Sequence, residues 1–222
     1  MSDRLQILTN IRRSLGRDAL APAQQQPLEA ALAAPQPNLI PAQTRLNGAA
    51  LLERFVTKAE AALASVQRLG NLDELPAAIE AYLRQHQLPA ALTVPESGLA
   101  ALLGPQPLPF ALLQRPARSG DAACLTGCFA AMAETGSVVL RSGAELPIGS
   151  GYLPDSHLVL LRSEQIVDCY ENLWRKVRAE LGTMPRSLNW ITGPSRSADI
   201  GMSMQMGAHG PIRLHLLLLE SP

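Results

Sequence analysis

Cysteine is scarce in this chain of 222 residues, which contains Cys124, Cys128 and Cys169 and no others. Three cysteines at this irregular spacing do not form the disulfide framework of a secreted protein. They also fall short of the four thiolates that an iron–sulfur cluster normally takes. Cys124 and Cys128 have no histidines at the spacing of a zinc site, which favours small core residues. We therefore expect the chain alone to bind no metal and no cofactor.

Aromatic residues and net charge are also low. Aromatic side chains make up 4% of the sequence, and 19 Lys and Arg residues balance 19 Asp and Glu residues. This composition argues against nucleic-acid binding, which needs a basic surface or aromatic side chains that stack on bases. No run approaches ~18 consecutive apolar residues, so no membrane-spanning helix is expected. Asp3 and Arg4 precede any apolar run, unlike a secretory signal, and the sequence predicts a cytoplasmic protein.

Common nucleotide-binding and hydrolase motifs are missing. Neither GxxxxGKS/T nor GxSxG occurs in the sequence. Residues 149–154 begin like the dinucleotide motif GxGxxG, but they end in proline and follow no clear strand. What remains is a globular composition, with 47% hydrophobic and 17% charged residues.

Leucine and isoleucine recur at helical spacing near the N-terminus, at Leu5, Leu8, Ile11 and Leu15. This spacing predicts a short amphipathic helix within residues 1–17, with arginines on its other positions. Two interpretations stay open. The helix is either a packed appendage or a docking element for another chain, through which the protein could form homo-oligomers.

Residues 18–48 are rich in proline, glutamine and alanine. Proline at this density disfavours long helices and central strands, so we predict a linker or an extended wrapping segment. From residue 49 to 222, helical and strand patterns alternate, which predicts βαβ units and a mostly parallel sheet covered on both faces. Within this domain we predict a long helix over 163–182, capped by Ser163, and a glycine turn leading into a helix over 193–206.

Three loops of the domain carry polar groups next to strand ends, where open α/β sheets bind ligands. The first comprises Glu134, Thr135, Gly136 and Ser137, directly before the strand at 138–140. Glu134 could act as a base or nucleophile, and its neighbours could bind a ligand. The alternative is a turn whose polar groups satisfy the local backbone.

The second loop covers residues 193–199. Gly193 permits close approach of the backbone, and Ser195 or Ser197 can cap the following helix. The free amides of that helix would form an anion site strengthened by the helix dipole. Asp199 competes with such an anion, so it would instead hold the loop or accept a hydrogen bond from a ligand hydroxyl.

The third loop places His209 between two glycines, immediately before the last strand. This histidine could shuttle a proton or donate to a carboxylate, or it could be structural. His157 is a weaker candidate at the start of its strand. His86 and His215 have the patterns of a helix-surface residue and a strand residue.

Four segments taken together resemble the lactate utilization protein C family, whose domain is called the LUD domain. They are Ala133–Leu140 (AETGSVVL), Pro154–His157, Thr192–Ile200 (TGPSRSADI) and Gly207–Pro211 (GAHGP). The match is ordered and extends over about half of the chain, whereas the N-terminal half resembles the family only in its layout. Residues 149–152 depart from the family's usual Arg-Ser-x-Ser.

The resemblance implies a three-layer α/β/α fold with an open, mostly parallel mixed sheet, similar to glucosamine-6-phosphate deaminase, ribose-5-phosphate isomerase and CoA transferases. It also implies a role with two iron–sulfur partner proteins in oxidising L-lactate to pyruvate. Because the chain has neither cluster ligands nor a nucleotide motif, it would be an accessory or substrate-binding subunit whose partners carry the electrons. The alternatives are a free-standing enzyme of the isomerase or CoA-transferase-like class that acts on an anionic substrate, and a pure scaffold.

We expect the three loops to converge on one cleft that binds a small anion. Its predicted catalytic residues are Glu134 and His209. Its predicted ligand-binding residues are Thr135, Gly136, Ser137, Gly193, Pro194, Ser195, Asp199 and Gly210.

Overall fold

The computed structural model describes residues 3–104, 107–198 and 204–220. The chain divides into two compact units, Met1–Leu39 and Ile40–Pro222, which are described separately. The second unit begins before the Ala49 start expected from the sequence, because Thr44 in the short 3₁₀ helix η1 (Ala42–Thr44) is already buried. No helix in the described part of the chain is long and apolar enough to cross a membrane.

The first unit consists of two helices, α1 (Asp3–Ser14) and α2 (Pro22–Ala33), neither of which buries a residue. Helix α1 matches the expected N-terminal helix. Helix α2 lies within the segment expected to be a linker without a long helix, so that expectation was wrong. Pro22 occupies the first turn, where no backbone N–H is needed, and the residues around the internal Pro27 are mostly good helix formers.

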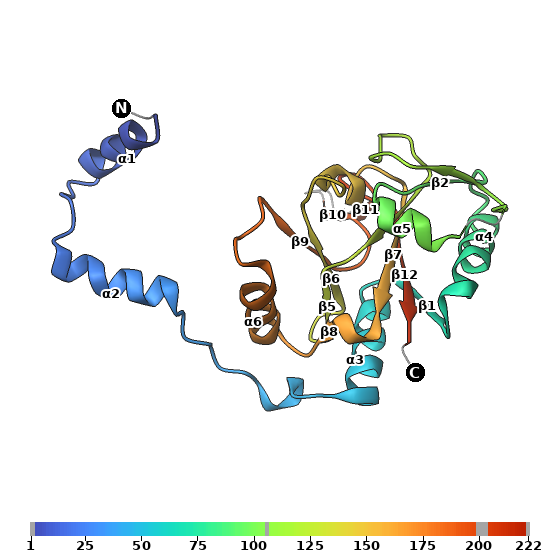
Figure 1. Cartoon of the computed structure of the whole chain (residues 1–222), viewed down its shortest axis with the longest axis horizontal. Helices are drawn as coiled ribbons and strands as arrows, with labels where there is room; N and C mark the ends of the chain where they lie inside the picture. The colour runs from blue at the N-terminus through green and yellow to red at the C-terminus, as the bar shows by residue number, and fades with distance from the viewer. Residues whose placement is uncertain (1–2, 105–106, 199–203, 221–222) are drawn as a thin grey trace. The chain divides into compact units, whose positions relative to one another are not determined.

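The second unit is built on a six-stranded sheet in which every neighbouring pair is parallel (Figure 1). The strand order is β1-β12-β7-β4-β2-β3. The strands are β1 (Ser65–Leu69), β2 (Ala91–Thr93), β3 (Ala111–Leu113), β4 (Ala123–Gly127), β7 (Ser156–Arg162) and β12 (Arg213–Leu219). The central strands β7 and β12 are almost wholly buried, which explains their continuous apolar sequences. The predicted α/β class with a mostly parallel sheet is confirmed.

Helices cover one face of this sheet, where alternate strand residues such as Leu158, Leu160 and Leu217 form a core. The helices are α4 (Leu75–Gln85) and α5 (Ser97–Leu102), and the 3₁₀ helix η2 (Leu72–Glu74) precedes α4. Helix α3 (Gly48–Ala61) packs on the opposite face, where Phe55 contacts the core that contains Leu216 and Leu218.

A smaller sheet with the order β8-β5-β6-β9 joins α3 on that second face. Its strands are β5 (Ala130–Met132), β6 (Ser137–Arg141), β8 (Ile166–Val167) and β9 (Leu188–Ile191). Helix α6 (Tyr170–Leu181) packs on the outer side of this sheet through Leu173. These strands and those of the six-stranded sheet therefore belong to two separate sheets, a division that the sequence pattern did not predict.

The predicted helix over 163–182 is wrong in its first half. Ser163–Gln165 forms a 3₁₀ helix, η4, and β8 follows it, so α6 begins only at Tyr170. Ile166 and Val167 pair with β5 in parallel, and Ile166 is buried. Tertiary pairing overrides the helical spacing here, and Ser163 does not cap α6.

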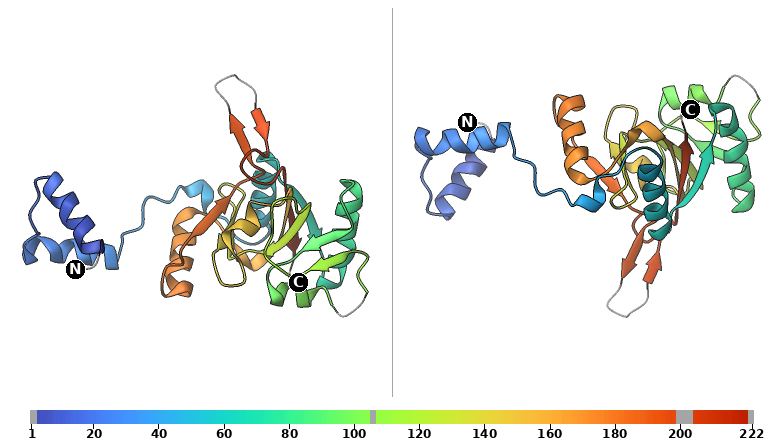
Figure 2. Two further views of the ribbon diagram at one scale, coloured as in Figure 1. Left: turned by 90° about the horizontal axis from the view of Figure 1, so that it is seen from above. Right: turned by 90° about the horizontal axis from the view of Figure 1, so that it is seen from below.

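The predicted helix over 193–206 is also wrong. The chain forms an antiparallel hairpin of β10 (Arg196–Ala198) and β11 (Met204–Met206), which projects from the two sheets (Figure 2). Backbone hydrogen bonds from Ser195 to Pro211 and from Gly207 to Ser195 hold the base of the hairpin together. Ser195 and Ser197 therefore cap no helix, and the anion site proposed at a helix N-terminus is absent at these described residues. Asp199 lies outside the described residues.

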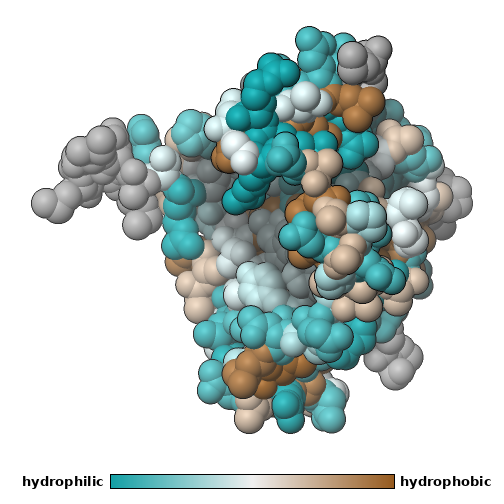
Figure 3. Space-filling view, turned by 90° about the vertical axis from the view of Figure 1, so that its left-hand side faces the viewer, coloured by the Kyte–Doolittle hydropathy of each residue, from teal (hydrophilic) through white to brown (hydrophobic). Residues whose placement is uncertain are grey.

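Large hydrophobic side chains are exposed in both units, among them Leu32, Leu39 and Met184. On the face shown in Figure 3, hydrophobic residues form separate patches among hydrophilic ones. Such a mixed surface is ordinary for a folded protein.

Candidate functional site

A cavity of about 240 Å³ lies at the amino ends of β7 and β12. Its walls come from the 3₁₀ helix η3 (Ile148–Gly151), the end of β9 and the segments that flank the β10–β11 hairpin. The described residues that line it are Gly151, Tyr152, His157, Trp190, Ile191, Thr192, Gly193, Pro194, Ser195, Arg196, His209, Gly210, Pro211 and Leu214. Since drug-sized ligands occupy pockets of about 300–1,000 Å³, this cavity suits a smaller molecule.

His157 is the fully buried titratable residue of this cavity. Its Nε2 lies 2.9 Å from Oγ1 of Thr126, which is also fully buried, on the neighbouring strand β4. Its Nδ1 has no hydrogen-bond partner among the described residues. Burial lowers the pKa of His157 to about 4, so the imidazole is neutral at neutral pH.

The charge of the cavity lining favours an anion. Arg196 contributes a permanent positive charge, and His209 is an exposed histidine at the same cavity. No Asp or Glu is found among the described residues that line it. A concave site with a cation and without opposing carboxylates attracts negatively charged ligands.

The structure brings five of the predicted site residues together at this cavity. Four of them, Gly193, Pro194, Ser195 and Gly210, were predicted to bind ligand, and the fifth is His209. The first loop does not contribute to the described lining: Glu134, Thr135, Gly136 and Ser137 lie elsewhere. The geometry therefore unites the second and third loops and leaves the first one apart.

Glu134 contacts the start of α6 instead. Its Oε2 accepts a hydrogen bond from the backbone N–H of Tyr170 at 3.2 Å, the first residue of that helix. A carboxylate at a helix N-terminus satisfies a free amide and interacts favourably with the helix dipole. This contact gives Glu134 a structural role, although the backbone amide that it satisfies belongs to a helix distant in the sequence and not to its own turn.

Gly136 and Gly193 both pack against the end of α3. Each has a positive φ, +72° and +70° respectively. A Cβ on Gly136 would lie 2.2 Å from the backbone nitrogen of Ala59, and one on Gly193 would lie 1.9 Å from the carbonyl oxygen of Ala62. The two glycines therefore permit close approach of loop and helix, which accounts for them without any ligand.

A chain of hydroxyl groups connects the first loop with the cavity wall. The Thr135 and Ser137 hydroxyls lie 2.6 Å apart, and the Ser137 hydroxyl lies 2.6 Å from that of Thr192. Thr192 lines the cavity, whereas Ser137 is buried behind it. Thr135 and Ser137 thus support the wall.

A second and larger cavity, of about 590 Å³, lies beyond the carboxyl ends of β2 and β4. At this point the chain connections reverse direction, because β2 leads outward to β3 while β4 leads towards β7. Open α/β sheets often bind ligands at such a point. The residues lining this cavity include Glu96, Cys128, Arg141, Glu145, Gln165 and Glu180.

The acidic lining of this second cavity makes it unsuitable for a small anion. Three glutamates face one arginine, and none of Glu96, Glu145 and Arg141 forms an ion pair within the described ranges. Burial raises the pKa of Glu96, and the negative charge of Glu145 raises it further. We therefore take the cavity at His157 as the candidate anion site.

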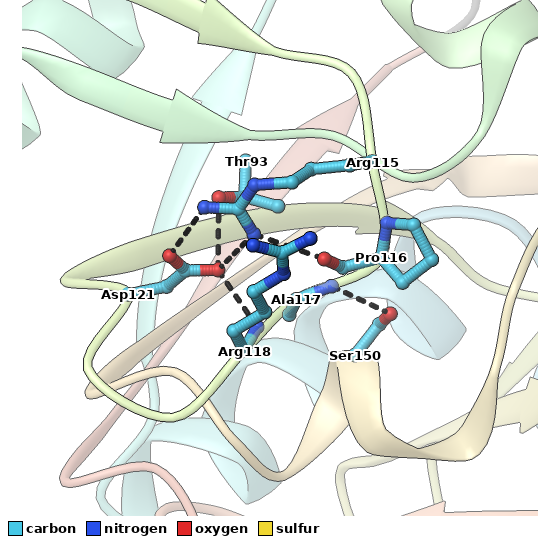
Figure 4. Close-up of polar contacts among 7 residues, drawn as sticks. All are labelled: Thr93, Arg115, Pro116, Ala117, Arg118, Asp121 and Ser150. Carbon is cyan, nitrogen blue, oxygen red and sulfur yellow. Dashed lines mark hydrogen bonds and ion pairs between the residues drawn. The ribbon is translucent and has the colours of Figure 1, made fainter.

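An ion-pair network supports the loop next to this site (Figure 4). Arg115 binds the Asp121 carboxylate through both of its terminal nitrogens at 2.8 Å, and Asp121 also accepts from Thr93 and from the backbone of Arg118. These contacts, led by the Arg115 hydrogen bond, lower the pKa of Asp121 to about 2. The Ala117 N–H donates to Oγ of Ser150 in η3, which joins the network to the cavity wall.

Comparison with known proteins identifies the class of domain. The LUD domain matches residues 119–219, which include every described residue of the candidate cavity and Thr126. In structure, the chain is similar to the crystal structure of a DUF162 family protein from Deinococcus radiodurans, with a TM-score of 0.57 and 26% identity. That likeness covers 78% of this chain and 99% of the other.

Two relatives in sequence carry the same description. Lactate utilization protein C of Deinococcus radiodurans is 34% identical over 152 residues, which are 66% of this chain and 69% of that protein. Lactate utilization protein C of Bacillus subtilis is 33% identical over 92 residues, which are 40% of this chain and 38% of that protein. The chain belongs to the lactate utilization protein C family, and the predicted resemblance is confirmed.

Sequence reasoning undervalued two residues of the cavity. The sequence favoured His209 over His157, although the apolar strand that follows His157 is a signal that could have indicated its burial. Arg196 was not singled out, because the segment around it was predicted to be a helix. Thr126 was missed altogether, since an isolated threonine in a strand carries no signal of its histidine partner.

Proposed function

We propose that this protein takes part in lactate utilization as a ligand-binding subunit, and that its cavity at His157 binds a small carboxylate such as L-lactate or pyruvate. The observation that supports this most is the composition of the cavity. Residues from two predicted loops meet there with Arg196, and no carboxylate is found in its described lining. The family supports the pathway, and the cavity supports the class of ligand.

We also propose that iron–sulfur partner proteins carry the electrons and that the complex is cytoplasmic. Oxidation of lactate requires an electron acceptor. Burial raises the pKa values of the Cys124 and Cys128 thiols to about 12, so these residues are poor sources of the thiolates that clusters need. The exposed apolar residues of α1 are available for a contact with such partners or with a second copy of the chain.

Thermal unfolding of the isolated protein with L-lactate, pyruvate, propionate, phosphate, CoA and nucleotides tests the ligand proposal. We expect the carboxylates to raise the Tm and the other compounds to leave it unchanged. Arg196→Gln should abolish the carboxylate effect. Arg186→Gln is the matched control, because Arg186 is exposed and does not line the cavity. Equal responses of the two variants would contradict the proposal.

Co-purification from cells tests the partner proposal. The full chain should retain proteins with the visible absorption of iron–sulfur clusters, and L-lactate oxidation should require the mixture. Turnover of a small anionic substrate by the isolated chain would instead favour the free-standing enzyme. That alternative has less support, because Glu134, its expected base or nucleophile, caps α6.

A further inference from the structure

The second cavity, of about 590 Å³, is bounded by residues from both sheets. Glu96 follows β2, and Gly127 is the last residue of β4, so both lie at the carboxyl edge of the six-stranded sheet. Arg141 is the last residue of β6 in the smaller sheet. The volume lies within the range of about 300–1,000 Å³ that is typical of small-molecule sites. This cavity shares no described lining residue with the cavity at His157, so it is a separate space.

The carboxylate of Glu96 is fixed at the wall of this cavity and keeps one oxygen free. Its Oε2 accepts a hydrogen bond from the backbone N–H of Gly127 at 2.8 Å, and both residues line the cavity. Its Oε1 forms no hydrogen bond within the described part of the chain, and it is not fully buried. An accessible oxygen on a half-buried side chain of the lining is available to a donor group of a ligand.

Glu145 brings a second carboxylate to the lining. Its Oε1 and Oε2 each lie 2.9 Å from the Ser97 hydroxyl, which holds the side chain at the start of α5. Burial raises the pKa of Glu96, and the negative charge of Glu145 raises it further. A cationic group of a ligand beside these two carboxylates would relieve their repulsion. The third glutamate of the lining, Glu180, already forms an ion pair with Lys176.

Arg141 supplies the opposite charge on the same lining. Its positive charge lowers the pKa of Glu96, yet it forms no ion pair or hydrogen bond with any described residue. A cavity that holds a guanidinium and carboxylates apart is complementary to a ligand with an ammonium group and a carboxylate of its own. The lining also has an apolar part, which consists of Phe129, Leu146 and Leu181.

We propose that this second cavity binds an α-amino acid with an apolar side chain, whose ammonium group contacts Glu96 and whose carboxylate contacts Arg141. Both the cavity and the class of ligand differ from those of the proposed function. A simple cation would leave Arg141 without a partner, and a simple anion would leave Glu96 and Glu145 without one. The described residues include no group of three His, Cys, Asp or Glu side chains placed to hold a metal ion, which favours an organic cation.

Titration calorimetry with L-leucine and two of its analogues tests the need for both charges. Isoamylamine is L-leucine without the carboxylate, and isocaproate is L-leucine without the ammonium group. We expect L-leucine to bind at least about tenfold more tightly than either analogue, because each analogue leaves a charged group of the cavity unpaired. Equal binding of isoamylamine and L-leucine would overturn the role of Arg141. If neither L-leucine nor L-phenylalanine binds, the whole inference fails.

Two substitutions locate the binding site at this cavity. Glu96→Gln and Arg141→Gln each remove one charge, and the Gln at position 96 can still accept from the Gly127 N–H. Each should weaken L-leucine binding by about tenfold or more. Glu60→Gln and Arg186→Gln are the matched controls, because both residues are exposed and neither lines the cavity. Equal binding by all four variants would overturn the inference.

The two cavities are tested separately by their ligands. The rise in Tm with L-lactate should persist in Glu96→Gln and Arg141→Gln, since neither residue lines the cavity at His157. If the unchanged protein responds to L-lactate but not to L-leucine, the inference fails and the proposed function stands. If it responds to L-leucine but not to any simple carboxylate, the proposed function fails and the inference stands.

Discussion

Glu134 Oε2 accepts a hydrogen bond from the backbone N–H of Tyr170 at 3.2 Å, and this contact places the carboxylate at the first turn of α6. Glu134 is the acidic residue that the sequence predicted to be catalytic. Its carboxylate instead connects the β5–β6 turn to the start of α6. The cavity that collects His209 and Ser195 does not include Glu134 in its described lining. The two residues expected to share one catalytic cleft therefore have separate surroundings.

Replacing Glu134 with Ala tests the structural role of this carboxylate. We expect the free energy of unfolding to fall by roughly 0.5–2 kcal/mol, because the first turn of α6 loses a hydrogen-bond acceptor and a favourable charge. The carboxylate-induced rise in Tm should stay unchanged. Urea unfolding measures the first quantity, and Glu60→Ala on the exposed side of α3 is the control. Loss of the ligand response at unchanged stability would restore Glu134 to the site.

Gly193→Ala should be strongly destabilising, by about 2–4 kcal/mol, since it combines a positive φ with a collision against α3. Gly182→Ala is a matched control that measures the cost of the positive φ without a collision. Gly182 also has a positive φ, but a Cβ there would meet nothing within 4 Å, so a loss of only about 1 kcal/mol is expected. Urea unfolding measures both losses of stability. Similar losses in the two variants would show that the backbone at residue 193 moves away from Ala62 and avoids the collision.

Acid should destabilise the protein in the pH range in which buried histidines are forced to become charged. Burial lowers the pKa values of His157 and His215 from 6.5 to about 4. The unfolded chain therefore binds more protons than the folded one between these values, and stability falls as the pH decreases from 6.5 to 4. Each histidine contributes about 1.4 kcal/mol per pH unit within this range.

Urea unfolding at several pH values measures this slope, and His157→Gln should reduce it by about half. The Asp121 carboxylate acts in a different range. Its pKa is lowered from 3.8 to about 2, so its stabilising effect is complete above 3.8 and is lost as the pH falls towards 2. An unchanged slope in His157→Gln would show that this histidine is not buried in the folded protein.

Deleting residues 1–18 should leave the Tm of the main transition nearly unchanged. Helix α1 buries no residue, and the compact unit that holds the sheets begins at Ile40. Because four large apolar residues of α1 are exposed, the deletion should weaken self-association or partner binding. Calorimetry and analytical ultracentrifugation measure the two effects. A large loss of stability would show that the helix packs on the α/β unit.

The sequence alone was sufficient for the elements whose patterns depend on burial. Strands β7 and β12 were predictable because parallel central strands are apolar on both faces, and α3 and α4 because one face of each helix packs on the sheet. The family was predictable from the order of four motifs. Five residues of the cavity were predictable for a simpler reason: polar and glycine-rich loops beside strand ends are typical ligand sites.

Tertiary structure alone decided the remaining features, because they depend on partners distant in the sequence. Ile166 and Val167 become a strand only because β5 offers a free edge, and β10 pairs with β11 beside a backbone hydrogen bond from Ser195 to Pro211. A local sequence pattern carries no information about either of these partners. The same reason applies to the site, where packing turned Glu134 towards α6 and placed Thr126 beside His157. A hydrogen bond between side chains of two buried strands leaves no local signal in the sequence.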